Sequence, residues 1–478
     1  MLTTTFSHAL SLAPTSHYWD LRTSLVINVL RSFCTTDHPA SMEKTQRISL
    51  RDPGIKGPMW VSKITLPAPT ADDSDIRSQL ELAFNLLRDA TPSAKGASLP
   101  TSGWDSYPVT VEWTGYRSGV TSSAAPLPLS ETEIYSKLMS EVSSPVTILY
   151  FHGGAYYLLD PASHRPVTSR LAHLTSGRVL SVRYRLAPQN AFPAGLLDAF
   201  VAYLSLLYPP PGALHAPVPA SHVIFSGDSA GGGLSLSLLQ LLLTLHRHTP
   251  SGPQIRWLGR TVALPLPGGV ATNSAWIDLT HSMPSIYRNA HYDYLPPPKS
   301  YPTIFPTDSI WPTDPPRHDI YTSSANLLHP LVSPITSPTW RGSPPLYLQC
   351  GEEMLADENH CLARWVGAQA ADVPVHLDYF ERMPHCFALV LPDQPYAKKA
   401  FSRWAGWCVR VVTGEVKAGE RRATVFEAKT LWETELDLKE MGGLGKEEVI
   451  ARMEEVVRER AANGQGKGGE VGWMAPKL

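Results

Sequence analysis

The feature that most constrains this chain is a sharp turn centred on Ser229, between an apolar strand and a helical segment. Residues 223–233 read Val-Ile-Phe-Ser-Gly-Asp-Ser-Ala-Gly-Gly-Gly, which contains the pattern Gly-x-Ser-x-Gly. A strand-to-helix turn tight enough to expose a serine hydroxyl strains the backbone, and side chains at Gly227 and Gly231 would collide with the neighbouring strand and helix. A lone pattern of this kind also fits a glycine-rich turn with a bystander serine, but the flanking segments favour a nucleophile. Asp228 is expected to fix the loop.

A second glycine-rich turn, His152-Gly-Gly-Ala155, lies upstream of the serine and follows an apolar strand predicted over residues 145–151. Small residues let backbone N–H groups approach the oxygen that becomes negative during acyl transfer, and rigid donors stabilise that charge without reorganising. The turn therefore predicts an oxyanion hole. Its expected members are Gly153, Gly154, Ala155 and Ala230. Gly154, Ala155 and Ala230 are expected to donate, while Gly153 keeps the loop tight and the His152 ring anchors it.

Two further motifs lie between these turns, Tyr184-Arg-Leu-Ala-Pro188 and Phe192-Pro-Ala194. With them, the chain resembles the hormone-sensitive-lipase-like branch of the α/β-hydrolases over about residues 145–410. In that family the first turn is usually His-Gly-Gly-Gly, so Ala155 departs at the third glycine. Alanine keeps its N–H, while its methyl group is expected to narrow the alcohol or acyl pocket. The resemblance implies a mostly parallel central sheet flanked by helices, with a lid from the N-terminus and an insertion, and the catalytic order serine, acid, histidine.

The resemblance places the catalytic acid in residues 351–358, Gly-Glu-Glu-Met-Leu-Ala-Asp-Glu, which follow a strand predicted over residues 345–350. The family has Asp-Pro-Leu-Arg-Asp-Glu at this point. Aligning the leucine and the aspartate of the two patterns makes Glu353 the acid, and a carboxylate one methylene longer still orients an imidazole if its loop sits slightly back. A shift of one residue makes Glu352 the candidate instead. Asp357 is expected to cap the following helix.

The general base is expected after a strand predicted over residues 373–380, where Met383-Pro-His-Cys-Phe387 matches the family's His-Gly-Phe. His385 would take the proton from Ser229 and later pass it to the leaving alkoxide, while the acid fixes its tautomer. Cys386 replaces the usual glycine, and its thiol is either a packing group or an oxidation-sensitive one.

Composition narrows the partners and the compartment. With 478 residues, 43% of them hydrophobic, and 41 basic against 43 acidic side chains, the chain can bury a large core and has no electrostatic footprint for nucleic acid. The five cysteines lack C-x-x-C spacing and there is no Asn-x-Ser/Thr sequon, so neither a disulfide framework nor a zinc site is predicted. These features favour a reducing, intracellular location, the cytoplasm, with peripheral attachment to the endoplasmic reticulum as the alternative. Neither a signal peptide nor a transmembrane segment is predicted.

The N-terminal part is divided into a helical arm, residues 1–57, and the beginning of a hydrolase core, residues 58–412. Strands predicted over residues 59–66 and 107–116 open the sheet. The arm carries an apolar stripe at helical spacing, which predicts a lid helix packed on the enzyme or, alternatively, a helix on a membrane surface. The stripe consists of Leu21, Leu25, Val26, Val29, Leu30 and Phe33.

Two later segments flank or interrupt the core. Residues 284–330 resemble the second cap segment of the family, and their aromatic side chains either line an apolar substrate pocket or pack a long connection. Residues 413–478 are charged and glycine-rich, which predicts a peripheral extension that is partly helical or disordered.

The sequence thus predicts a serine hydrolase that cleaves carboxylic esters through an acyl-enzyme, with water as second substrate and no metal or organic cofactor. By resemblance, the substrates are uncharged small-molecule esters with short or medium acyl chains, or esters of the sterol and xenobiotic type. A lactonase, an amidase or an acyltransferase would carry the same residues. A non-catalytic small-molecule receptor on this fold is a further alternative, and the presence of His385 argues against it.

Overall fold

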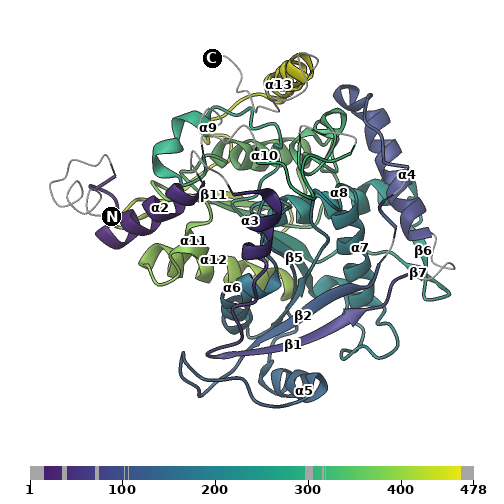
Figure 1. Ribbon diagram of the computed structural model, residues 1–478, viewed down its shortest axis with the longest axis vertical. Coiled ribbons are helices and arrows are strands. Elements are labelled where there is room, and N and C mark those ends of the chain that lie inside the picture. Colours follow the sequence, from purple (N-terminus) through teal and green to yellow (C-terminus); the bar gives the residue numbers. More distant parts are fainter. Residues whose placement is uncertain are drawn as a thin grey trace.

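A ten-stranded sheet forms the centre of the computed structural model, which describes residues 15–34, 40–69, 75–101, 103–105, 107–296, 305–314, 317 and 319–464 (Figure 1). The spatial order is β1-β2-β4-β3-β5-β8-β9-β10-β11-β12, parallel from β4 to β11 and antiparallel elsewhere. The sheet strands are β1 (Met59–Leu66), β2 (Val109–Tyr116), β3 (Thr147–Phe151), β4 (Arg178–Val182), β5 (Val223–Asp228), β8 (Gly269–Asn273), β9 (Leu346–Gly351), β10 (Val375–Phe380), β11 (Arg421–Phe426) and β12 (Glu433–Leu436). The predicted mostly parallel sheet is confirmed.

Helices cover both faces of this sheet, because its inner strands are apolar on both sides. In β3, Leu149 and Phe151 pack into one core cluster and Ile148 and Tyr150 into the other. Helices α4, α7, α8 and α10 contribute to the first cluster, and α2, α6, α11 and α12 to the second. The helices are α2 (Leu21–Cys34), α3 (Met42–Ser49), α4 (Asp75–Ala90), α5 (Glu131–Glu141), α6 (Pro161–Thr175), α7 (Ala194–Leu207), α8 (Ala230–His248), α9 (Ser285–Arg288), α10 (Ala356–Gln369), α11 (Phe387–Val390), α12 (Pro395–Val412) and α13 (Lys446–Gly464).

Short elements complete the fold and join its layers. A separate hairpin consists of β6 (Gln254–Trp257) and β7 (Arg260–Ala263). The 3-10 turns are η2 (Pro92–Ala94), η3 (Ala220–His222), η4 (Ala290–Tyr292), η6 (Ser324–Asn326) and η7 (Pro334–Thr336).

None of the helices in the described ranges is both long and apolar enough to cross a bilayer. All five cysteines are free.

The N-terminal arm forms the predicted helix, and its buried face agrees only in part with the predicted apolar stripe, of which Val26 and Leu30 pack half-buried against the core. Helix α2 buries Thr23, Ser24 and Ile27, whereas Leu21 is exposed and Phe33 is 76% exposed. The buried side is largely polar because hydrogen bonds fix it, including one of 2.9 Å between the Thr23 hydroxyl and the hydroxyl of Tyr396 in α12. Counting apolar residues alone therefore found part of the contact face and missed its polar residues. The strands predicted over residues 59–66 and 107–116 are β1 and β2, at the edge of the sheet.

The sequence predicted a peripheral C-terminal extension that is partly helical; the helix is present as α13, but the residues before it are part of the central sheet. Strand β11 pairs in parallel with β10, and β12 pairs with β11, so the extension widens the central sheet. Helix α13 lies over the segment between β8 and β9, at the top of Figure 1, and Arg460 donates to the Thr280 carbonyl (3.2 Å) and to the Asp319 carboxylate. Strand β11 was not predicted because it has only six residues and lies in a charged, glycine-rich segment. Two expectations concern residues outside the described ranges. They are the lack of a signal peptide at residues 1–14 and the disordered end at residues 465–478.

Candidate active site

Ser229 lies between β5 and α8, at the edge of the sheet where the parallel strands end. Its φ of 50° and ψ of −122° form a conformation that a non-glycine residue adopts only under strain. A Cβ atom at Gly227 or Gly231 would collide with the carbonyl oxygen of Phe151 on β3, so both positions require glycine. The turn leaves Ser229 partly exposed between buried neighbours, as a nucleophile at such an elbow must be.

The loop after β3 packs against this elbow and presents backbone donors. Within the described residues, the N–H groups of Gly154, Ala155 and Ala230 have no hydrogen-bond acceptor, so they are available to a negative oxygen. Gly153 instead donates its N–H to the Asp228 carboxylate at 3.2 Å, which tightens the loop and removes this donor from the predicted hole. Gly154 (φ 105°) and Ala155 (φ 51°) turn the chain with positive φ.

Asp228 connects the elbow to the loop through a buried network. The Tyr150 hydroxyl donates to its carboxylate at 2.6 Å, and His164 Nε2 lies 3.4 Å from it. Burial opposes ionisation, but the charge and hydrogen bond of His164 hold the pKa of Asp228 below its usual value. The ionised carboxylate therefore fixes the loop, in the role expected of Asp228.

His152 anchors the same loop through its ring. Nδ1 lies 2.7 Å from the carbonyl oxygen of Gly153, and the ring stacks on Tyr184 with centroids 4.4 Å apart. Burial lowers the pKa of His152 to about 3, so the ring is neutral. Such a ring holds the backbone and does not exchange protons near neutral pH.

Glu353 and His385, which follow β9 and β10, meet at the carboxyl edge of the sheet. Glu353 Oε2 lies 3.1 Å from His385 Nδ1, and both side chains are buried. Ser274, which follows β8, donates its hydroxyl to the same carboxylate oxygen at 3.0 Å. Burial raises the pKa of Glu353, and the contacts with His385 and Ser274 oppose that shift. A carboxylate in this position fixes the Nδ1–H tautomer and leaves Nε2 free for proton transfer.

The two alternative carboxylates lie elsewhere. Glu352 forms an ion pair with Arg382 at 2.7 Å, on the outer side of the loop. Asp357 is not the helix N-cap that was predicted, because α10 begins at Ala356 and Asp357 is its second residue. Its carboxylate accepts the N–H of Ser285 at 2.9 Å and pairs with Arg288 at 2.5 Å, so it ties α10 to the insertion. Of the three candidates, Glu353 alone contacts His385.

The nitrogen that would accept the serine proton faces a thiol. Cys386 Sγ lies 3.5 Å from His385 Nε2, and no hydrogen bond joins Nε2 to the Ser229 hydroxyl. Burial raises the pKa of Cys386 to about 12, so the thiol stays protonated. Burial disfavours the imidazolium, but the Glu353 carboxylate at Nδ1 raises the pKa of His385 above its usual value of 6.5. Catalytic hydrogen bonds are often long or poorly aligned before substrate binds. The missing hydrogen bond between Ser229 and His385 therefore does not exclude proton transfer.

The insertion covers the oxyanion loop with aromatic rings. Tyr321 stacks on Tyr156 with centroids 3.8 Å apart, and Phe305 meets Tyr157 edge-on at 6.4 Å. Tyr294 lies 6.0 Å from the His385 ring. These rings therefore pack on the residues that follow Ala155 and beside the ring of His385.

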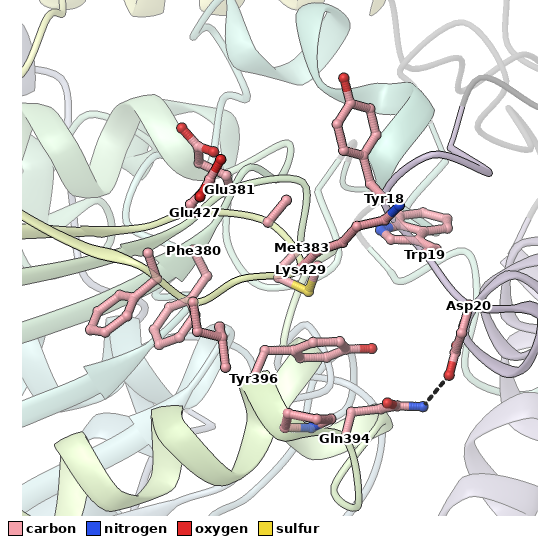
Figure 2. A pocket seen from close by; sticks show the side chains of 14 residues that line it. Tyr18, Trp19, Asp20, Phe380, Glu381, Met383, Gln394, Tyr396, Glu427 and Lys429 are labelled. Carbon is pink, nitrogen blue, oxygen red and sulfur yellow. Dashed lines mark hydrogen bonds between the residues drawn. The ribbon is translucent and has the colours of Figure 1, made fainter.

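A pocket of about 270 Å³ lies on the outer side of the loop that carries the base (Figure 2). Its walls come from the N-terminal turn, the end of β10, the start of α12 and the connection between β11 and β12. Figure 2 shows the rings of Trp19, Phe380 and Tyr396 and the sulfur of Met383 among the side chains that line it. None of Ser229, Glu353 and His385 lines this pocket, so it is separate from the candidate active site.

Two residues of the site were not singled out in the sequence. Ser274 directly follows β8, and listing the polar residue after every parallel strand would have found it. Asp293 lies in the insertion, where its carboxylate accepts the backbone N–H of His385 at 3.2 Å. Its carboxylate also accepts the N–H groups of the adjacent Tyr294 and Leu295, but its contacts with the two loops are made with residues about sixty or more positions further along the chain, which no local pattern marks.

Comparisons with known proteins identify a family and several relatives. A profile of the α/β-hydrolase fold family matches residues 148–389. An acetyl-hydrolase of Streptomyces hygroscopicus is 31% identical over 272 residues, which is 56% of this chain and 77% of that protein. The carboxylesterase NlhH of Mycobacterium tuberculosis is 30% identical over 253 residues, 51% of this chain and 68% of that protein.

Solved structures share the architecture. An esterase of the bacterial hormone-sensitive lipase family superposes with a TM-score of 0.52 at 22% identity, covering 82% of this chain and 99% of that one. EstE5 soaked with p-nitrophenyl butyrate superposes with a TM-score of 0.54 at 21% identity, covering 83% and 100%. At these identities the likeness establishes the fold alone.

Proposed function

This chain belongs to the α/β-hydrolase fold family, and we propose that it hydrolyses carboxylic esters with Ser229, Glu353 and His385 as its catalytic triad. The membership confirms the predicted family, and relatives named acetyl-hydrolase and carboxylesterase support an enzyme of the serine-hydrolase type. The observation that carries the triad is the buried contact of 3.1 Å between Glu353 and His385, together with a serine in strained backbone geometry.

The proposed reaction begins when Ser229 Oγ attacks the ester carbonyl carbon and His385 Nε2 takes the hydroxyl proton. The carbonyl oxygen becomes negative, and the N–H groups of Gly154, Ala155 and Ala230 stabilise it. The imidazolium, stabilised by Glu353, then gives its proton to the leaving alkoxide, and an acyl-enzyme remains on Ser229. Water repeats the sequence on the acyl group, with Nε2 taking a water proton, and releases the carboxylic acid.

The enclosed triad supports small, uncharged substrates. His385 and Glu353 are both buried, so the reacting group must enter a site with few counter-charges. We propose esters with short or medium acyl chains, or compact esters of the sterol and xenobiotic type, and the name acetyl-hydrolase of one relative favours the short end. The N-terminal arm and the 284–330 insertion would act as a lid over this site.

The test is labelling with a fluorophosphonate probe, combined with hydrolysis of p-nitrophenyl acetate. Wild-type protein should be labelled and active, and Ser229→Ala should lose both properties while retaining its melting temperature. A residual rate of roughly 10³–10⁴-fold over water is expected from the oxyanion hole and binding. Hydrolysis by Ser229→Ala near the wild-type rate, with contaminating esterase excluded, would refute the proposal. A folded wild-type protein that neither labels nor hydrolyses esters would point instead to the small-molecule receptor.

A further inference from the structure

We propose that Asp293 is a positioning residue, which holds the acid loop and the base loop in the relative position that catalysis needs. This proposal rests on the proposed function, since it concerns the pairing of Glu353 with His385. Asp293 follows η4 in the insertion and is fully buried. It touches neither triad side chain. Its role follows from the backbone groups that it binds.

The two carboxylate oxygens of Asp293 reach different loops. Oδ2 accepts the N–H of Met354 at 2.8 Å, and Met354 directly follows the proposed acid. Oδ1 accepts the N–H of His385 itself at 3.2 Å, and it also accepts the N–H groups of Tyr294 at 2.7 Å and Leu295 at 3.3 Å within its own turn. A single side chain thus accepts one backbone hydrogen bond from each of the two loops. The position of one loop is therefore tied to that of the other.

The insertion holds the loop of Glu353 by hydrogen bonds to a single peptide group. The carbonyl oxygen of Glu353 accepts the side-chain amide of Asn289 at 3.0 Å, and the N–H of the same peptide group, on Met354, binds Asp293. Asn289 and Asp293 flank η4, so one turn of the insertion holds both ends of this group. A peptide held at both ends cannot rotate freely, and this fixes the direction in which the Glu353 side chain leaves the backbone.

The N-terminal helix supports the same turn. The Arg31 guanidinium, in α2, donates to the carbonyl oxygen of Asp293 at 2.5 and 3.0 Å and to that of His291 at 3.2 Å. The contacts thus run from α2 through the insertion to the acid and the base. This connection gives the N-terminal arm a part in catalysis although none of its described residues touches the reacting groups.

The positions of acid and base matter because they come from separate loops, after β9 and β10. Misplacement by about 1 Å can cost on the order of 10² in rate even when all reacting groups are present. In Asp293→Asn the amide oxygen can still accept at Oδ1, but its NH₂ would face the N–H of Met354, donor against donor. The substitution should therefore release the acid loop while keeping the volume of the side chain.

The test compares Asp293→Asn with a matched variant, Asp278→Asn. Asp278 is also fully buried in the segment after β8, and it accepts the backbone N–H groups of Thr280 and Ser282 at 2.9 Å each. It contacts neither triad loop. We expect Asp293→Asn to lower kcat for p-nitrophenyl acetate by about 10²-fold with KM little changed, and Asp278→Asn to lower the melting temperature with kcat retained. Equal losses of kcat in both variants would overturn the proposal, because a general effect of losing a buried carboxylate would then explain them.

A second readout does not depend on turnover. In a crystal structure of Asp293→Asn, the separation between Glu353 Oε2 and His385 Nδ1, 3.1 Å here, should exceed hydrogen-bond range. An unchanged separation would overturn the positioning role even if activity falls. If the wild-type enzyme proves inactive on every ester, the proposed function fails, while this comparison still decides whether Asp293 holds the two loops together.

Discussion

Replacing Cys386 by glycine should make the enzyme faster. Cys386 has a φ of 48° and a ψ of 34°, in the left-handed region that glycine adopts without cost, and its thiol lies 3.5 Å from His385 Nε2. That nitrogen must instead accept the Ser229 hydroxyl in the proposed first step. A thiol whose pKa is about 12 is protonated at every pH of interest, so it competes as a weak donor.

The magnitude follows from the bond that is removed. A weak hydrogen bond contributes about 0.5–1 kcal/mol net, so releasing Nε2 should raise kcat roughly two- to fivefold. The stability should change little. Relief of the left-handed backbone should raise the free energy of unfolding by about 1–2 kcal/mol. The flexibility of glycine should lower it by about 0.5–1 kcal/mol, and the loss of the buried side chain by about 1 kcal/mol.

The assay measures kcat on p-nitrophenyl acetate together with melting temperature, for Cys386→Gly and Cys386→Ser. Serine places a stronger donor beside Nε2, so the expected order of kcat is glycine, then cysteine, then serine. Cys408→Ala serves as control, because it removes another buried thiol, from α12, away from the triad. A glycine variant slower than wild type at unchanged melting temperature would refute the competition between thiol and serine.

Three further outcomes follow from the site. Glu353→Gln should cost on the order of 10⁴ in kcat, whereas Glu352→Gln should stay close to wild type and Asp357→Asn should lower mainly the melting temperature; a dead Glu352→Gln enzyme would mean that Glu352 is the acid. The rate should fall as the pH drops through the pKa of His385, which lies above 6.5, because the protonated ring cannot accept a proton; a midpoint below 6.5 in kcat/KM would contradict this. Ala155→Gly should leave p-nitrophenyl acetate little changed and improve esters of bulky tertiary alcohols; equal losses on both would assign Ala155 to loop rigidity.

The elements that carry local signals could be predicted from the sequence. Ser229 and the oxyanion loop each combine an apolar strand with glycines whose replacement the neighbouring backbone forbids, and such requirements are visible in a few adjacent residues. Glu353 and His385 follow strands at the same edge of the sheet, so chain order and strand ends were enough to pair them as an expectation.

The features that were missed depend on distant parts of the chain. Strand β11 belongs to the sheet because it pairs with the edge of β10. Its six residues include two arginines, so its composition alone does not predict a strand. The polar part of the buried face of α2 includes a hydrogen bond between Thr23 and Tyr396 of α12, which hydrophobic spacing cannot reveal. Asp357 looked like a cap because it opens an acidic run, yet its partners lie in the insertion. The Asp293 contacts likewise bring together segments that no short pattern connects.

The most direct test of the central claim is to trap the acyl-enzyme. The protein is mixed with p-nitrophenyl acetate, quenched in acid during turnover and digested, and the acetylated peptide is identified by mass spectrometry. Acetyl should appear on the peptide that contains Ser229, accumulate further in Glu353→Gln if deacylation slows more than acylation, and be absent in Ser229→Ala. Acetyl on a different residue, with hydrolysis undiminished in Ser229→Ala, would contradict a serine-hydrolase mechanism at this site.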